Sequence, residues 1–186
     1  IAETLYLLGR FDEAKIYNEK ALRIEENLQL EISHESVANN SRQGLILQEQ
    51  GDPQALGYLV KAYELSTQMP ENNVQILMSL GNLGLIYHKS GDYAKAKECY
   101  RNAIERVKET ENPLDPGFSF LYTNMANACL DMGQWKEALK YYETAHETSQ
   151  TYGDPYIINE INCGMGLCKQ NLGRPKEAIE HYKSYI

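Results

Sequence analysis

The sequence lacks any hydrophobic run long enough to cross a bilayer, for which a helix needs roughly 18–20 apolar residues. Residues 1–10 contain neither the basic start nor the apolar stretch of a secretory signal peptide. Hydrophobic residues nevertheless make up 42% of the 186 positions, which is too many for a disordered chain. We therefore expect a folded, soluble, cytoplasmic protein that has no membrane partner and is large enough to bury a substantial core.

Positive charge is scarce, since 18 lysines and arginines stand against 26 aspartates and glutamates. The net charge is −8 at pH 7. A nucleic-acid-binding surface needs clustered positive charge to neutralise phosphates, and a membrane-surface module needs a polybasic patch. The charge balance argues against both kinds of partner.

Cysteine is also scarce, and no pair of the four thiols forms a CxxC motif. Cys163 and Cys168 are five residues apart, which on a helix separates them by about 140° and makes them unsuitable ligands for one metal. A chain of this length folds without disulfides. We therefore interpret Cys99, Cys129, Cys163 and Cys168 as ordinary buried or half-buried thiols, and we expect no metal site.

Catalytic motifs are absent as well. The four histidines share no short motif, and the sequence contains no HExxH, GxSxG, glycine-rich phosphate loop or calcium-binding loop. Carboxylate pairs such as Asp12 and Glu13 fall on predicted helices, where they are typical of a solvated face. We therefore expect no enzymatic activity and no cofactor.

The sequence does contain an internal repeat of 40–42 residues. Its glycines recur with spacings of 42, 40, 42 and 40, at Gly9, Gly51, Gly91, Gly133 and Gly173. An alanine follows each glycine by four or five residues, at Ala14, Ala55, Ala96, Ala138 and Ala178. Seven residues later, four copies carry another alanine, at Ala21, Ala62, Ala103 and Ala145. Seven residues is about two helical turns, so both alanines of a copy lie on one face of a predicted helix.

A small residue also precedes the glycine by seven positions in four copies, at Gly44, Gly84, Ala126 and Gly166. Two antiparallel helices can touch backbone to backbone only where the side chain is small or absent. The repeat therefore predicts helical hairpins, in which the recurring glycine supplies the left-handed conformation that commonly ends a first helix.

This pattern resembles the tetratricopeptide repeat, whose signature combines Leu-Gly, Tyr, Gly, Ala-x3-aromatic and Ala. The third copy matches it best, with Leu80, Leu83, Gly84, Tyr87, Gly91, Ala96, Tyr100 and Ala103. The second copy departs from it, because its alanine comes one residue early and Pro53 is expected to open the second helix. The 40–42-residue period is similar to that of the long-period arrays of kinesin light chains and spindle-orientation adaptors. The resemblance implies an all-α fold, a right-handed α-solenoid of helix–turn–helix hairpins.

We expect residues 1–186 to form a single array. Its units are 1–30, 31–70, 71–112, 113–153 and 154–186, of which the first and last are partial. Because both ends fall within a unit, we interpret the sequence as a fragment of a longer protein. In a solenoid each unit buries one face on its neighbour. Apolar residues near the two ends are therefore candidates for self-association: Leu7, Leu8, Tyr185 and Ile186.

The resemblance also implies a binding surface, because in this family the first helix of each unit lines a concave groove that holds a peptide. Asn82 and Asn124 occupy the same position of adjacent units, and Asn127 lies three residues further on nearly the same face. An asparagine amide offers a donor and an acceptor to a peptide backbone; alternatively, these amides bond within the array or face water. The candidate groove residues are Arg42, Met78, Asn82, Leu85, Lys89, Phe120, Thr123, Asn124, Asn127, Asp131, Leu167 and Asn171, and the equivalent positions of the last unit include Glu160, Cys163 and Gly164.

We expect a protein–protein interaction scaffold that binds an extended peptide or a partner helix in this groove. A clamp for a chain-terminal carboxylate, as in chaperone-binding members of the family, is disfavoured because only Asn82 of the required set is present. Two alternatives stay open. One is a peptide-sensing regulatory array that controls an attached effector domain, and the other is a structural spacer or oligomerisation arm.

Overall fold

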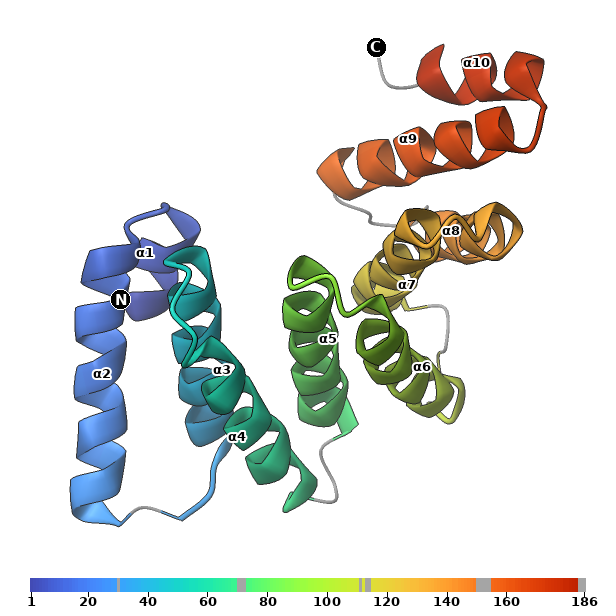
Figure 1. Ribbon diagram of the computed structural model, residues 1–186. Helices are drawn as coiled ribbons and strands as arrows, with labels where there is room; N and C mark the ends of the chain where they lie inside the picture. Colours follow the sequence, from blue (N-terminus) through green and yellow to red (C-terminus); the bar gives the residue numbers. More distant parts are fainter. Residues whose placement is uncertain (30, 70–72, 111, 113–114, 150–154, 184–186) are drawn as a thin grey trace. The chain divides into compact units, whose positions relative to one another are not determined.

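The computed structural model describes residues 1–186 except 30, 70–72, 111, 113–114, 150–154 and 184–186 (Figure 1). These described residues form α-helices and one 3₁₀ turn, η1 (Pro116–Phe118), and contain no strand, which confirms the predicted all-α fold. Consecutive helices come in pairs that are joined by short turns. The pairs are α1 (Ala2–Leu7) with α2 (Phe11–Leu28), α3 (His34–Glu49) with α4 (Ala55–Thr67), α5 (Asn73–Lys89) with α6 (Tyr93–Lys108), α7 (Ser119–Asp131) with α8 (Trp135–Ser149), and α9 (Pro155–Asn171) with α10 (Pro175–Lys183).

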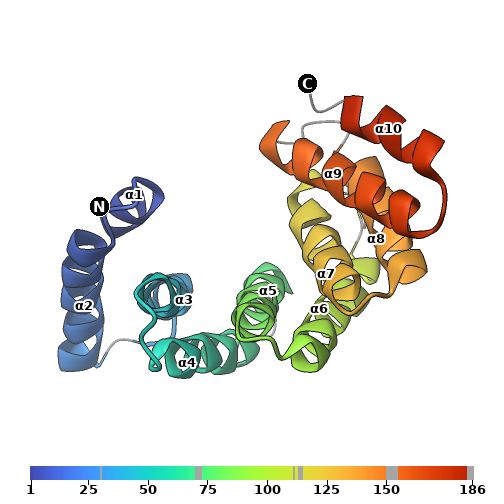
Figure 2. The same cartoon turned by 45° about the horizontal axis from the view of Figure 1, so that its top comes forward.

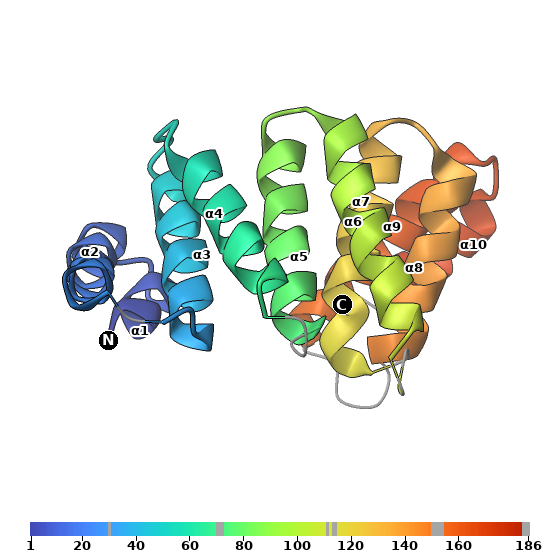
Figure 3. The same ribbon diagram turned by 90° about the horizontal axis from the view of Figure 1, so that it is seen from below.

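The chain divides into two compact units, Ile1–Ile86 and Tyr87–Ile186. Unit 1 contains α1 to α4 and most of α5; within it, α3 packs along α4 and α2 packs on α3 (Figure 3). Unit 2 contains the last residues of α5 and α6 to α10; within it, α8 packs between α7 and α9, and α7 also contacts α9 (Figures 1 and 2). Each unit therefore has its own set of packed helix pairs.

The turn inside each pair is the same structure, and it needs the recurring glycine. At Gly133, between α7 and α8, φ is +70°, a left-handed conformation that other residues adopt only with strain. The Gly133 amide donates to the Leu130 carbonyl at 2.9 Å, and the Gln134 amide donates to the Cys129 carbonyl at 2.9 Å. This is the Schellman pattern of helix ends. The other four turn glycines also have positive φ, which confirms the predicted role: Gly9, Gly51, Gly91 and Gly173.

The small residues before the turns lie where two helices meet. A Cβ added to Gly44 on α3 would lie 2.5 Å from Cγ of Leu59 and 3.0 Å from the carbonyl oxygen of Ala55, both on α4. A Cβ on Gly166 of α9 would overlap the ring of Tyr182 on α10. The alanines within the first four residues of the second helices are fully or almost fully buried, with at most 2% of their surface exposed: Ala14, Ala55, Ala96, Ala138 and Ala178. Close approach to the partner helix is therefore confirmed at Gly44, where it involves backbone, and at Gly166, where it involves a tyrosine ring.

The start of the second pair differs from the sequence prediction. Pro53 does not open α4, which begins at Ala55 with Gln54 before it as N-cap. The Asp52 side chain accepts a hydrogen bond from the Gln54 amide at 2.9 Å, and the Asp52 carbonyl accepts one from the Ala55 amide at 3.1 Å. Pro53 and Gln54 therefore belong to a tight turn that is held by Asp52, so the prediction was wrong by two residues.

Among the described residues, no helix combines the length and the apolar character that crossing a membrane requires. Near the amino end, Leu7 and Leu8 are strongly exposed, with 76% and 65% of their surface accessible. The other two predicted self-association residues, Tyr185 and Ile186, lie outside the described residues.

Candidate functional site

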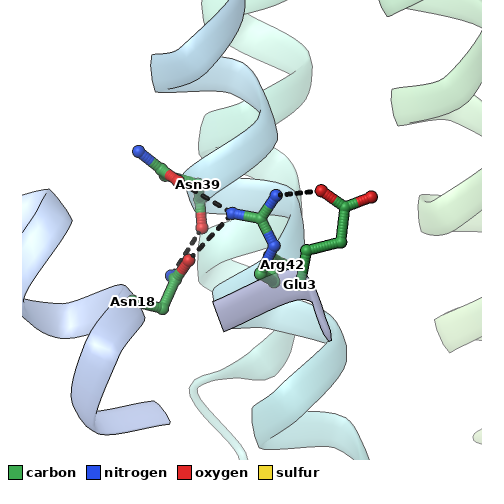
Figure 4. Close-up of polar contacts among 4 residues, drawn as sticks. All are labelled: Glu3, Asn18, Asn39 and Arg42. Carbon is green, nitrogen blue, oxygen red and sulfur yellow. Dashed lines mark hydrogen bonds and ion pairs between the residues drawn. The ribbon is translucent and has the colours of Figure 1, made fainter. Parts of the chain in front are cut away.

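In unit 1, the predicted groove residue Arg42 on α3 makes hydrogen bonds within the protein (Figure 4). One guanidinium nitrogen donates to Oδ1 of Asn39 at 2.8 Å and to Oδ1 of Asn18 at 3.2 Å. The other terminal nitrogen forms an ion pair with Glu3 at 3.2 Å. The Arg42 side chain is 18% exposed, so its charge is mostly screened from solvent by α1 and α2.

The groups around Arg42 complete a buried polar cluster between α2 and α3. Asn18 is fully buried, and its amide nitrogen donates to the Asn39 carbonyl at 2.8 Å and to Gln43 Oε1 at 3.0 Å. The Asn39 amide nitrogen in turn donates to Glu25 Oε1 at 2.6 Å. Because buried polar groups cost free energy unless they are paired, this cluster fixes one arrangement of α3 against α2.

The remaining predicted residues of unit 1 lie on one face of α5. Met78, Asn82 and Leu85 are spaced by four and three residues, which places them on the same side of the helix. Met78 is exposed, with 51% of its surface accessible, and Asn82 and Leu85 are half-buried. Within the part of the chain that the structure describes, the Asn82 amide makes no hydrogen bond.

In unit 2, four predicted residues share one face of α7: Phe120, Asn124, Asn127 and Asp131. Asn124 is half-buried, and its amide makes no hydrogen bond to any described residue. Asp131 is paired, since its carboxylate lies 2.7 Å from Nε2 of His88 at the end of α5. The α7 face therefore offers one unpaired amide between residues that are already engaged.

Three predicted residues lie away from this arrangement or bond within their own helix. Thr123 is buried, and its hydroxyl donates to the Ser119 carbonyl at 3.0 Å. The Asn171 amide donates to the Leu167 carbonyl at 2.9 Å. Lys89, the last residue of α5, is exposed.

A cleft opens between α7 and α9, with a volume of about 310 Å³. We call it the α7–α9 cleft; its lining residues are Asn127 and Leu130 of α7, Tyr142 of α8, and Asn159, Glu160, Cys163, Gly164 and Leu167 of α9. The cleft contains the predicted groove residue Asn127 together with the predicted α9 residues Glu160, Cys163, Gly164 and Leu167. The predicted Asn171 is not part of it. Sequence reasoning missed Leu130, Tyr142 and Asn159.

The floor of the cleft is organised by a chain of hydrogen bonds that crosses three helices. The buried Tyr142 hydroxyl on α8 donates to Oδ1 of Asn127, and Nδ2 of Asn127 donates to Oε1 of Glu160 at 2.7 Å. A Cβ on Gly164 would overlap the Tyr142 ring, so the phenol reaches Asn127 only because α9 has no side chain there. The missing side chain at Gly164 is the sequence signal that points to Tyr142.

The protonation state of Tyr142 sets the direction of these hydrogen bonds, which run from Tyr142 through Asn127 to Glu160. Burial, reinforced by Cys168 and by the carboxylates of Glu160 and Asp131, raises the pKa of Tyr142 far above its ordinary value. The phenol therefore stays protonated and donates, which turns the Asn127 amide nitrogen toward Glu160.

The chemistry of the α7–α9 cleft suits binding better than catalysis. Leu130, Leu167 and Cys163 provide apolar contact area, and 39% of the Leu167 surface is exposed. The polar part of the lining consists of the amides of Asn127 and Asn159 and the carboxylate of Glu160. Across the described residues, no group of three or more histidine, cysteine or acidic side chains is placed to hold a metal ion.

Comparison with known sequences identifies repeats along almost the whole chain. A family profile of the tetratricopeptide repeat matches residues 34–109 and 118–186, and a second profile of this repeat matches residues 1–28. Protein KINESIN LIGHT CHAIN-RELATED 3 of Arabidopsis thaliana is 27% identical over 184 residues, which are 97% of this chain and 28% of that protein. Protein KINESIN LIGHT CHAIN-RELATED 1 of the same plant is 24% identical over 147 residues, which are 78% of this chain and 24% of that protein. The chain thus spans about a quarter of these curated relatives.

Solved structures share the fold at low identity. BtubC (BKLC) from P. vanneervenii has a TM-score of 0.85 and 16% identity, covering 99% of this chain and 75% of that one. Nearly identical TPR-like repeats of a Podosopora anserina protein described as a kinesin light chain have a TM-score of 0.78 and 18% identity, covering 99% and 89%. At these identities the likeness concerns the arrangement of helices alone.

Proposed function

Because the chain belongs to the tetratricopeptide repeat family, we propose that it is a protein–protein interaction scaffold that holds a peptide segment of its partner in the α7–α9 cleft. The observation that carries this proposal is the cleft itself, which combines apolar side chains with amides and a carboxylate. Peptide-binding sites commonly pair an apolar pocket with a few fixed polar groups. The curated relatives are named as related to kinesin light chains, and this likeness favours the same class of function.

Asn124 supports an extended ligand. It lies one helical turn before Asn127 on α7, and its amide has no hydrogen bond within the described residues. A half-buried amide without a partner can offer both a donor and an acceptor to a passing peptide backbone. Asn82, which occupies the same position of the preceding copy, is also without a hydrogen bond in the described part of the chain. We propose that Asn124 binds the backbone of a peptide in the α7–α9 cleft, and that Asn82 offers the same donor and acceptor to a peptide in unit 1.

The test begins with selection of binding peptides from a display library of random segments of about a dozen residues. The affinities of the selected peptides are then measured by fluorescence anisotropy for the wild type and for Leu167→Ala and Asn124→Ala. Loss of a buried hydrogen bond should weaken binding to Asn124→Ala by about 1–3 kcal/mol. Lys108→Ala on α6, exposed and outside the cleft, is the control. Unchanged affinity for both Leu167→Ala, in the cleft, and Asn124→Ala, beside it on α7, would discard the proposal.

Self-association is a second candidate function, favoured by a separate apolar surface in unit 1. Ile16, Ile24 and Leu28 lie on one face of α2, and each exposes at least half of its surface. We propose that this face of α2 associates with a second copy of the chain. Light scattering of the wild type and of Ile24→Lys with Leu28→Lys tests it: the variant should be smaller at equal concentration. A wild type that is monomeric at all concentrations would contradict it.

A further inference from the structure

The proposed function does not specify which side chains the ligand carries. The residues that line the α7–α9 cleft indicate which ones would fit. Resting on that function, we propose that the α7–α9 cleft selects a segment in which an arginine or lysine side chain stands next to an apolar one. The cation pairs with the carboxylate of Glu160, and the apolar side chain packs against Leu130 and Leu167.

The first support is that Glu160 is held in place although it is exposed. An exposed glutamate usually samples many rotamers, and ordering it costs entropy. Here Oε1 accepts the Asn127 amide at 2.7 Å, and Asn127 is fixed in turn by the buried Tyr142 hydroxyl. The second carboxylate oxygen makes no hydrogen bond to the described residues. A positioned carboxylate with one oxygen available is suited to a cationic donor.

The second support is that the chain itself does not neutralise this charge. Among the described residues, no lysine, arginine or histidine forms an ion pair with Glu160. The lysine of α9, Lys169, pairs instead with Glu177 on α10 at 3.4 Å. A cation of the ligand would therefore not have to displace an ion pair within the described residues to reach Glu160.

The apolar half of the specificity follows from what surrounds the carboxylate. Leu130 of α7 and Cys163 and Leu167 of α9 line the same cleft, while the Tyr142 ring occupies the space beside Gly164. A volume of about 310 Å³ is small, so it accommodates one or two side chains and not the face of a domain. The alkyl stems of lysine and arginine also pack well on apolar surface.

The net charge of the chain acts in the same direction at longer range. With −8 at pH 7, the protein attracts basic segments and repels acidic ones, and this steering weakens as salt screens it. Binding of the predicted ligand should therefore weaken with ionic strength, whereas binding of a neutral analogue should not.

The test uses two small probes of matched shape, N-acetyl-leucyl-arginine amide and its citrulline analogue, which lacks the charge. Each is titrated to about 10 mM while methyl NMR signals of Leu130 and Leu167 are followed in the intact chain. The arginine probe should bind the wild type about fivefold more tightly than the citrulline probe, as expected for one partly exposed ion pair. Glu160→Gln, which still accepts the Asn127 hydrogen bond, should remove this preference. Glu147→Gln, an exposed glutamate of α8 outside the cleft, should keep it.

The result can overturn the inference in two ways. Equal affinities of the two probes for the wild type, or an arginine preference that survives Glu160→Gln, would show that Glu160 does not select a cation. Absence of methyl shifts at both leucines would show that the cleft does not take a leucine next to arginine. The library selection separates these failures from failure of the proposed function. Peptides that bind the cleft without basic residues would retain the function and reject the inference.

Discussion

One position of the repeat is used in opposite ways in copy two, which lies in unit 1, and in copy four, which lies in unit 2. Nine residues before the turn glycine, copies two, three, four and five carry Arg42, Asn82, Asn124 and Gly164. In unit 1, Arg42 is consumed by internal hydrogen bonds to Asn18 and Asn39 (Figure 4). In unit 2, Asn124 makes none within the described residues, and Gly164 leaves space that Tyr142 fills. The same first-helix position thus bonds helices together in copy two, whereas in copy four its amide has no hydrogen bond within the described residues, as is also the case for Asn82 of copy three.

The largest effect should come from adding a side chain at Gly164 of unit 2, where the Tyr142 ring occupies the space. Gly164→Val places carbon atoms inside the Tyr142 ring, so α9 must move away from α8, and the free energy of unfolding should fall by about 3 kcal/mol. Gly57→Val is the matched control, because a Cβ at Gly57 on α4 meets no atom within 4 Å. The control should change stability by less than about 1 kcal/mol. Urea unfolding measures the free energy of unfolding of both variants. Equal losses would show that the position of Gly164 is no more tightly packed than that of Gly57.

The second largest effect should come from removing the hydrogen bonds that Arg42 makes within unit 1. Arg42→Ala leaves the side-chain Oδ1 atoms of Asn18 and Asn39 without their shared donor, which should cost about 2 kcal/mol of stability. Arg101→Ala, an exposed arginine of α6, should cost less than about 0.5 kcal/mol. Thermal unfolding of both variants checks the difference. A neutral Arg42→Ala would show that the cluster does not stabilise unit 1.

A smaller loss is expected from cutting the hydrogen-bond chain in the cleft. Tyr142→Phe removes only the hydroxyl that donates to Asn127, so stability should fall by about 1 kcal/mol. Asn127 is then free to rotate, and peptide affinity should also fall because Glu160 is no longer fixed. Tyr141→Phe, the half-buried neighbour on α8, is the control. If both variants bind peptide like the wild type, the positioning role of Tyr142 is contradicted.

The smallest effect concerns the side of α9 that faces away from the cleft, where Lys169 Nζ lies 2.9 Å from His181 Nε2 of α10. Burial, followed by the charges of Lys169 and His146, lowers the pKa of His181 below the ordinary 6.5, while Glu177 and Glu143 act in the opposite direction. The unfolded chain therefore binds the proton more readily than the folded one. Stability from this group is present above pH 6.5 and is lost as the pH falls through the folded-state pKa.

His181→Gln keeps an acceptor for Lys169 but does not titrate. Urea unfolding from pH 7.5 down to about 5 should therefore show a shallower loss of stability for the variant than for the wild type. Parallel curves for the two proteins would contradict the assigned contribution of His181. Together with Gly164→Val, the result compares how much stability α9 gains from its contact with α8 and from its contact with α10.

Local features of the fold were predictable because they depend on residues close in sequence. The turn glycines and the alanines that follow them define hairpins through local conformation and close packing. Pro53 was misplaced because Asp52 bonds the two following amides and delays α4, a choice between two compatible local structures. The site was less predictable. Arg42 meets Asn18 and Glu3 only after α1, α2 and α3 have packed, and no spacing in the sequence encodes that meeting.

The identical turns also have a kinetic consequence. Each closes its hydrogen bonds between residues only three to five positions apart, as with Gly133 to Leu130 and Gln134 to Cys129. Loops this short close quickly and with little loss of chain entropy. Helix pairs can therefore form early and independently, and docking of successive pairs becomes the slower event. The time that a nascent chain spends with the α7–α8 hairpin uncovered is then set by how soon α9 docks, and the α7–α9 cleft exists only after that step.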